Sequence, residues 1–340
     1  MLEANKNNNI LGFGEIMLRL TPSNNQKIMQ VNSFDATYGG GEANVVCSLA
    51  NFGHKTKYVT KVPNNSLGDK VIRDLKSYNV DTSDILQGDG RLGIYFLEIG
   101  HGLRSTEVIY DRKYSSISMT NKNEFDIEKM LEDVKLVHLS GITPALSKEL
   151  YDLTIDIAKF AKKTDILVSL DSNYRAKLWS LENAKEFLEE ILPYVDIAFL
   201  GNLDMTNILK YESKKIGYEE SLKDLYEKLF KKYPNLKYAA CTKRSVNSIN
   251  NNSLKGYLFD KENLHVSNEY NFDILDRVGG GDAYTAGILH GILDNLNSRE
   301  TVEFGTCASV LKHSIRGDIN LVDRKSVSSL IEEGLQNIKR

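Results

Sequence analysis

The sequence predicts an α/β fold in which a doubly wound, mostly parallel sheet carries a small antiparallel β lid. Two observations predict the sheet. Short β-branched apolar runs alternate with longer stretches of helical period, and the 340 residues have an ordinary globular composition, 41% hydrophobic and 26% charged. A third observation predicts the lid, because two segments break this rhythm with alternating polar and apolar residues.

The candidate strands and helices alternate along most of the chain. The strand candidates are 10–18, 56–62, 134–141, 165–171, 196–202 and 237–244, and the clearest helical stretches are 147–163, 183–192 and 219–232. Strand, helix and strand in this order favour parallel pairing through right-handed crossovers. We therefore expect a sheet with helices on both faces.

The lid is predicted from residues 15–38 and 91–120. The second segment contains GIYFLEIGHG and STEVIYDRKY, whose alternation suits antiparallel strands with one solvated face. The polar segment 246–253 is interpreted as a surface turn, and no internal repeat or Pro-rich linker divides the chain. The expectation is one domain over residues 1–340, with the lid formed by two insertions.

Charge, cysteine and hydropathy patterns exclude several classes of protein. The formal net charge is −3, with 43 basic and 46 acidic residues, so no nucleic-acid partner is expected. Three cysteines without CxxC spacing and six histidines without HxH or HExxH spacing predict a reducing compartment and no transition-metal site built by the protein. No apolar run approaches the roughly 18 residues of a membrane span, and the first residues lack an apolar signal region, so we expect a cytoplasmic protein without a membrane partner.

Several strand candidates end in polar residues. These residues are Ser140-Gly141, Asp171-Ser172-Asn173, Asn202 and Thr242-Lys243-Arg244. In open α/β sheets, ligands bind beyond the carboxyl ends of the strands, so these residues predict the edge of a site. Each of them could instead cap a helix.

Three consecutive glycines begin a predicted helix in DRVGGGDAYTAG, residues 276–287. An apolar stripe of helical period follows, so Gly279, Gly280 and Gly281 would present free N–H groups at a helix N-terminus, where anions bind. Asp282 beside this nest makes sense if it accepts the proton of a neutral hydroxyl that attacks a phosphoryl group. The helix N-terminus is expected to keep the pKa of Asp282 low. The alternative is a glycine-rich connection in which Asp282 only caps the helix.

Two other glycine patterns do not fit this chain. Gly12 and Gly14 follow an apolar run, but the third glycine of a dinucleotide fingerprint would fall on Met17. The phosphate loop GxxxxGK[ST] is absent from the sequence. A nicotinamide-dependent dehydrogenase is therefore disfavoured.

The chain resembles the ribokinase-type carbohydrate kinase family over nearly its whole length. YGGGEANVVCSLANFG at 38–53 is similar to the family's N-terminal signature, and DRVGGGDAYTAG to its C-terminal signature. The segments that resemble its 2-keto-3-deoxygluconate kinase branch are VIYDRKYSS (108–116), DSNYRAKLW (171–179), CTKRSV (241–246) and LKHSIRGDINLV (311–322). The resemblance implies a ribokinase-like fold, a sugar-acid kinase and a homodimer, and an exposed lid edge would also favour pairing with a second copy.

The resemblance also implies residues that bind the sugar acid. These are Gly40, Asn44, Tyr95, Tyr110, Arg112 and Arg175. The planar fork of an arginine matches a carboxylate, so Arg112 and Arg175 are expected to hold that group. A structural salt bridge is the alternative for Arg175, and simple packing is the alternative for Tyr95.

On the nucleotide side, the resemblance implies ATP along the carboxyl ends of the later strands. Its residues would be Asn202, Thr242, Lys243 and Arg244. Lys243 and Arg244 could neutralise phosphate charge together with Mg²⁺, and a solvated basic pair is the alternative.

The sequence departs from the family pattern at two positions. An Asn-x-x-Glu string often helps to hold the Mg²⁺ water shell, but here it ends in Met205, so Asp204 or Glu212 would have to compensate and no metal ligand is assigned. Gly280 stands for the usual alanine, which removes a methyl group and is expected to preserve the nest.

The expected reaction is ATP-dependent phosphorylation of the 6-hydroxyl of 2-keto-3-deoxygluconate, giving 2-keto-3-deoxy-6-phosphogluconate and ADP. A kinase for a neutral sugar, such as fructose or ribose, is one alternative. A sugar or nucleotide sensor without activity is another, and Met205 is the residue that favours it. The sequence leaves the gluconate and galactonate epimers undistinguished.

Overall fold

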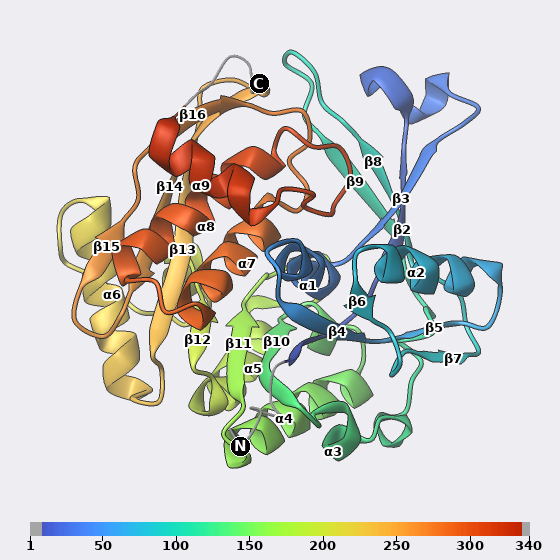
Figure 1. Ribbon diagram of the computed structural model, residues 1–340, viewed down its shortest axis with the longest axis horizontal. Coiled ribbons are helices and arrows are strands. Elements are labelled where there is room, and N and C mark those ends of the chain that lie inside the picture. Colours follow the sequence, from blue (N-terminus) through green and yellow to red (C-terminus); the bar gives the residue numbers. More distant parts are fainter. Residues whose placement is uncertain (1–8, 335–340) are drawn as a thin grey trace, which may run out of the picture.

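The main sheet has ten strands and is mostly parallel, as predicted. The computed structural model describes residues 9–334, and its strands follow the order β15-β14-β13-β12-β11-β10-β1-β4-β6, with β16 paired to β14 (Figure 1). Parallel pairs join the strands from β13 to β6, whereas β14 pairs antiparallel with β13, β15 and β16. The bounds are Asn9–Phe13 (β1), Lys55–Val59 (β4), Val80–Asp81 (β6), Val134–Ser140 (β10), Leu167–Asp171 (β11), Ile197–Phe199 (β12), Tyr238–Val246 (β13), Asn251–Phe259 (β14), Leu264–Val266 (β15) and Tyr270–Asp273 (β16).

Helices cover both faces of this sheet, which is the doubly wound arrangement. One face packs against Lys148–Lys163 (α4), Leu181–Ile191 (α5) and Tyr218–Lys232 (α6), close to the three helical stretches predicted. The other face packs against Gly41–Asn51 (α1), Gly280–Leu293 (α7), Ser298–Lys312 (α8) and Arg324–Glu333 (α9) (Figure 1). Neighbouring residues of one strand enter different cores, as Ile10 and Leu11 do, because side chains alternate between the faces of a sheet.

The lid is a separate sheet of four strands, which is antiparallel, as predicted, except at its central pair. Its order is β3-β2-β8-β9, with bounds Met17–Thr21 (β2), Asp35–Gly39 (β3), Ile94–Glu98 (β8) and Glu107–Asp111 (β9). The outer pairs β2–β3 and β8–β9 are antiparallel, and the central pair β2–β8, which joins the two insertions, is parallel. Figure 1 shows this sheet standing at the upper right, away from the main sheet.

The expected strand at 10–18 is in fact two strands in two sheets. β1 ends at Phe13 in the main sheet, and β2 begins at Met17 in the lid. Gly14 lies between the two strands, and a Cβ at this position would lie closer than 3.0 Å to the Glu42 carboxylate. The surface turn expected at 246–253 is present but shorter, at 247–250, because β13 extends to Val246 and β14 begins at Asn251.

The remaining elements complete the cover of the sheets. They are Ser66–Ser77 (α2), Ile127–Met130 (α3), and the paired strands Lys61–Pro63 (β5) and Leu86–Gly88 (β7). Within residues 9–334, no helix combines the length and apolar character needed to cross a bilayer. Residues 1–8, which contain most of the segment inspected for a signal region, lie outside the described residues.

Candidate active site

A pocket of about 390 Å³ opens where the carboxyl ends of the strands meet the lid. Nine of the residues predicted from the sequence line it: Gly40, Asn44, Tyr95, Tyr110, Arg112, Arg175, Gly279, Gly281 and Asp282. They come from α1, from β8 and β9 of the lid, from the loop after β11, and from the start of α7. Segments about 240 residues apart in the chain therefore share one cavity.

The glycine stretch forms the N-terminus of α7, as predicted. Gly279 has a left-handed backbone conformation with φ of 80°, and a Cβ there would collide with the carbonyl oxygen of Asp318. A Cβ on Gly281 would meet nothing within 4 Å, so its backbone faces open space in the pocket. Free N–H groups with unobstructed access are what an anion at a helix N-terminus requires.

Gly280 has a different environment. A Cβ at this position would lie closer than 3.0 Å to the ring of His313. That ring is buried, packs on Phe272 with ring centroids 4.8 Å apart, and has its Nδ1 2.7 Å from the backbone oxygen of Ser309. The imidazole therefore fills the space that the methyl group of the usual alanine would occupy.

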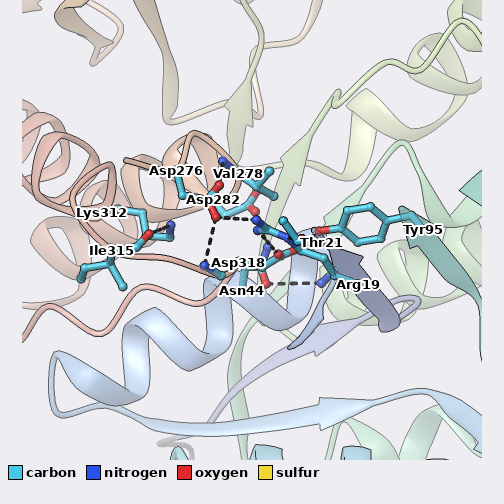
Figure 2. Close-up of polar contacts among 12 residues, drawn as sticks. Arg19, Thr21, Asn44, Tyr95, Asp276, Val278, Asp282, Lys312, Ile315 and Asp318 are labelled. Carbon is cyan, nitrogen blue, oxygen red and sulfur yellow. Dashed lines mark hydrogen bonds and ion pairs between the residues drawn. The ribbon is translucent and has the colours of Figure 1, made fainter. Parts of the chain in front are cut away.

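Asp282 lies at the inner end of the pocket and contacts α1. The amide Nδ2 of Asn44 donates to Asp282 Oδ2 at 2.6 Å (Figure 2). Burial raises the pKa of Asp282 to about 6, against the opposing effects of Asn44 and Arg175. The expectation of a low pKa was therefore wrong, because desolvation outweighs the stabilisation expected from the helix N-terminus. A pKa of this value suits a general base that works near neutral pH.

Two further carboxylates lie near Asp282 at the carboxyl ends of the strands. Burial, together with the charges of Asp282 and Asp204, raises the pKa of Asp171 to about 7. Asp204 accepts hydrogen bonds from Ser172 Oγ at 3.0 Å and from the Gly201 N–H at 2.7 Å, and burial raises its pKa as well. This end of the pocket is thus rich in carboxylate charge, which Arg175 offsets in part.

These carboxylates fit the chemistry of a Mg²⁺ site. Met205 is fully buried in the core, so it provides no ligand, whereas the preceding Asp204 faces Ser172 and acts on Asp171. Oxygen donors are what Mg²⁺ prefers, and a cation would relieve the repulsion that raises the pKa of Asp171. Of the two residues considered as compensation, Asp204 is at the site, and Glu212 lies by α6, where its backbone oxygen accepts from Lys228.

Arg112 and Arg175 both line the pocket, but they differ in burial and in hydrogen bonding. Arg112 is buried directly after β9, where its Nη2 donates to the buried Glu15 carboxylate and its guanidinium carbon lies 5.6 Å from the centre of the Tyr110 ring. Its Nε has no hydrogen-bond partner among the described residues. Arg175 is exposed and donates only to the backbone oxygens of Asn173 and Tyr174, so the described residues offer no support for a structural salt bridge.

Tyr95 belongs to a buried polar network that the sequence did not reveal (Figure 2). Its hydroxyl donates to Asp318 Oδ2 at 2.5 Å, so Tyr95 makes a specific polar contact as well as packing in the lid. Arg19 of β2 donates to Asp318 at 2.9 Å and to Asp276 at 2.5 Å. Asp318 also lines the pocket, although Gly317-Asp318 looks like an ordinary turn in the sequence. The sequence signal for Asp318 as a site residue was its position in LKHSIRGDINLV, a segment that resembles the family.

The residues expected on the nucleotide side lie outside the 390 Å³ pocket. Lys243 lines another hollow, of about 350 Å³, with Tyr218 and Tyr257, and its Nζ lies 4.4 Å from the centre of the Tyr218 ring. Arg244 lies on the same strand, and its pKa is lowered by burial and by Arg277, which itself lines the larger pocket. Thr242 on β13 and Asn202 after β12 complete this edge of the sheet.

A mostly parallel α/β fold in which a glycine-rich helix N-terminus and the Asp282 carboxylate line one cavity suits a phosphotransferase for small molecules. The profile of the pfkB family carbohydrate kinases matches residues 7–323, and the chain belongs to this family of sugar kinases. The resemblance noted in the sequence and the expectation of a sugar phosphotransferase are both confirmed.

Relatives of the chain include kinases named for 2-dehydro (2-keto) sugar acids. The 2-dehydro-3-deoxygalactonokinase of Haloferax volcanii is 25% identical over 331 residues, covering 97% of this chain and 99% of its own. The 2-dehydro-3-deoxygluconokinase of Bacillus subtilis is 25% identical over 323 residues, covering 94% of each. The crystal structure of a Thermotoga maritima 2-dehydro-3-deoxygluconokinase matches with a TM-score of 0.92 at 39% identity, over 95% of this chain and 98% of that one.

Proposed function

We propose that this kinase transfers the γ-phosphoryl group of ATP to the 6-hydroxyl of 2-keto-3-deoxygluconate. The observation that carries the proposal is that Arg112 and Arg175 line the same pocket as Asp282 and the glycine nest. This cavity thus holds groups suited to a carboxylate together with a group suited to a hydroxyl that becomes phosphorylated. The names of the relatives from Bacillus subtilis and Thermotoga maritima support the same substrate class.

The proposed reaction assigns a role to each group. The sugar hydroxyl attacks the γ-phosphorus, a new oxygen–phosphorus bond forms, and the bond from that phosphorus to the bridging oxygen of ADP breaks. Asp282 accepts the hydroxyl proton, held in position by Asn44 at 2.6 Å. The N–H groups of Gly279–Gly281 stabilise charge on the transferring group. Mg²⁺ bound with ATP supplies further positive charge to the phosphate oxygens, and Asp204 with Asp171 would hold it.

One observation favours a kinase for a neutral sugar instead. The guanidinium of Arg112 is already paired with the buried carboxylate of Glu15, so its charge is offset within the protein. A substrate carboxylate would then depend on the exposed Arg175 and on the unpartnered Nε of Arg112. Arg175 is therefore the residue whose removal separates the two substrates.

The test is ADP release with Mg²⁺-ATP and each of 2-keto-3-deoxygluconate, its galactonate epimer, fructose and ribose. The proposal predicts turnover with a sugar acid, and it predicts that Arg175→Gln raises KM for that substrate about 10- to 100-fold, the range of a lost charge-assisted contact. Arg73→Gln, which removes an exposed arginine of α2 outside the pocket, is the matched control and should change KM little. Turnover with fructose or ribose alone, unchanged by Arg175→Gln, would establish the neutral-sugar kinase.

A further inference from the structure

Lys312 is a fully buried lysine that the reaction above does not use. It ends α8 and has no exposed surface. Within residues 9–334, its ammonium donates one hydrogen bond, to the backbone oxygen of Ile315 at 3.0 Å. Lysine is almost never fully buried unless it is paired, because an ammonium loses its hydration there. Its position therefore calls for compensating charge nearby.

That charge comes from the network that holds Tyr95. Burial, the largest effect, lowers the pKa of Lys312 below its usual value, while Asp276 and Asp318 act to raise it and Arg19 opposes them. Arg19 bonds to both carboxylates. When Lys312 is protonated, its charge and that of Arg19 balance the charges of Asp276 and Asp318 in this group of side chains. If Lys312 were neutral, this group would carry one uncompensated negative charge.

The group lies directly behind the glycine nest. A Cβ on Gly279 would come within 3.2 Å of Lys312 Cε and would collide with the carbonyl oxygen of Asp318. Asp282 also acts on Lys312, although its carboxylate faces Asn44. Figure 2 shows Lys312 and Ile315 on one side of Asp276 and Asp282, with Arg19 and Tyr95 on the other.

We propose that Lys312 is a positioning residue that keeps the charge behind the Gly279–Gly281 nest neutral, so that the nest can accept the phosphates of the nucleotide. An uncompensated carboxylate behind the nest would repel those phosphates at low effective dielectric constant. The inference rests on the proposed phosphoryl transfer, but it concerns nucleotide binding and is independent of which sugar is phosphorylated.

The first test is Lys312→Met, which keeps the length of the side chain and removes its charge. We expect binding of a non-hydrolysable ATP analogue with Mg²⁺, measured by calorimetry, to weaken about tenfold. This is the order of effect of one uncompensated unit charge near the phosphates. Binding of the sugar, measured separately, should change less than about twofold. The matched control is Lys57→Met, which removes a buried lysine paired with Asp84 at 2.7 Å outside the pocket and should leave nucleotide affinity unchanged.

The second test restores neutrality with Lys312→Met and Asp318→Asn together. The asparagine can still accept from Arg19 and can donate to the Tyr95 hydroxyl, so the contacts persist while one negative charge is lost. A charge role predicts that the double variant regains nucleotide affinity to within about threefold of the wild type. Equal losses in the single and double variants would overturn the proposal, as would normal affinity in Lys312→Met.

Melting curves show whether each variant folds, and so distinguish the loss of the Lys312 charge from the loss of its packing. If Lys312→Met fails to fold, the double variant decides: a folded protein with near wild-type nucleotide affinity supports the charge role. Failure of both variants to fold would overturn it, because the lysine would then act through packing alone. A wild-type protein that binds the ATP analogue but phosphorylates none of the sugars would refute the proposed substrate and leave these binding measurements valid.

Discussion

Gly280→Ala restores the residue that is usual at this position in the family, yet we expect it to destabilise this protein. The added methyl group would lie closer than 3.0 Å to the His313 ring, which is buried and held between Phe272 and the backbone oxygen of Ser309. Forcing one carbon into a filled core costs about 1–3 kcal/mol. At this chain length, each kcal/mol lowers Tm by about 2 °C, so calorimetric melting should show a decrease of about 2–6 °C.

Gly281→Ala is the matched control for that measurement. It adds the same methyl group one residue further along α7, where nothing lies within 4 Å. Its Tm should stay the same or rise slightly, because alanine favours a helix over glycine. Equal Tm values for Gly280→Ala and the wild type would refute the argument that His313 occupies the space of the methyl group.

Three further predictions concern the base and the assembly. Asp282→Asn should lower kcat about 10²- to 10⁴-fold, as expected for loss of a general base, while calorimetry finds the sugar affinity within a few-fold of the wild type; near-normal turnover would rule out the proton transfer. Because burial raises the pKa of Asp282 to about 6 and of Asp171 to about 7, the active carboxylate forms are lost as pH falls. If both must be ionised, kcat/KM should fall roughly tenfold per unit between pH 7 and pH 6 and roughly 100-fold per unit below pH 6. Asp171→Asn should shift this acid-side decline of kcat/KM to lower pH. An unshifted decline would show that Asp171 and Asp282 titrate independently. The lid edge is proposed to pair with a second copy, and light scattering that finds only monomers would refute this.

Local patterns predicted the elements that depend on local physics. The helix from Lys148 to Lys163 follows from the apolar period, and the start of α7 follows from the glycines. The division of 10–18 into β1 and β2 could not be predicted, because apolar residues occur in both strands. A strand pattern does not specify which sheet receives the strand.

The site was predicted where a residue type matched a chemistry, and missed where the role depends on a distant partner. Asp282 was identified because a carboxylate follows a nest, but its raised pKa comes from burial that no local pattern displays. Arg112 carries the expected charge, and its pairing with Glu15 appears only once the lid is folded. Arg19 and Asp318 are 299 residues apart, so neither could suggest the other.

The bond between Arg19 and Asp318 also fixes when the pocket can form during synthesis. One partner lies in the first lid strand and the other lies 299 residues later, so the contact must wait until residue 318 has left the ribosome. The central strands can pair earlier, since their partners are closer in sequence. A nascent chain would therefore hold a formed sheet before it holds a complete pocket, and affinity for the substrate would be acquired in the last step of folding.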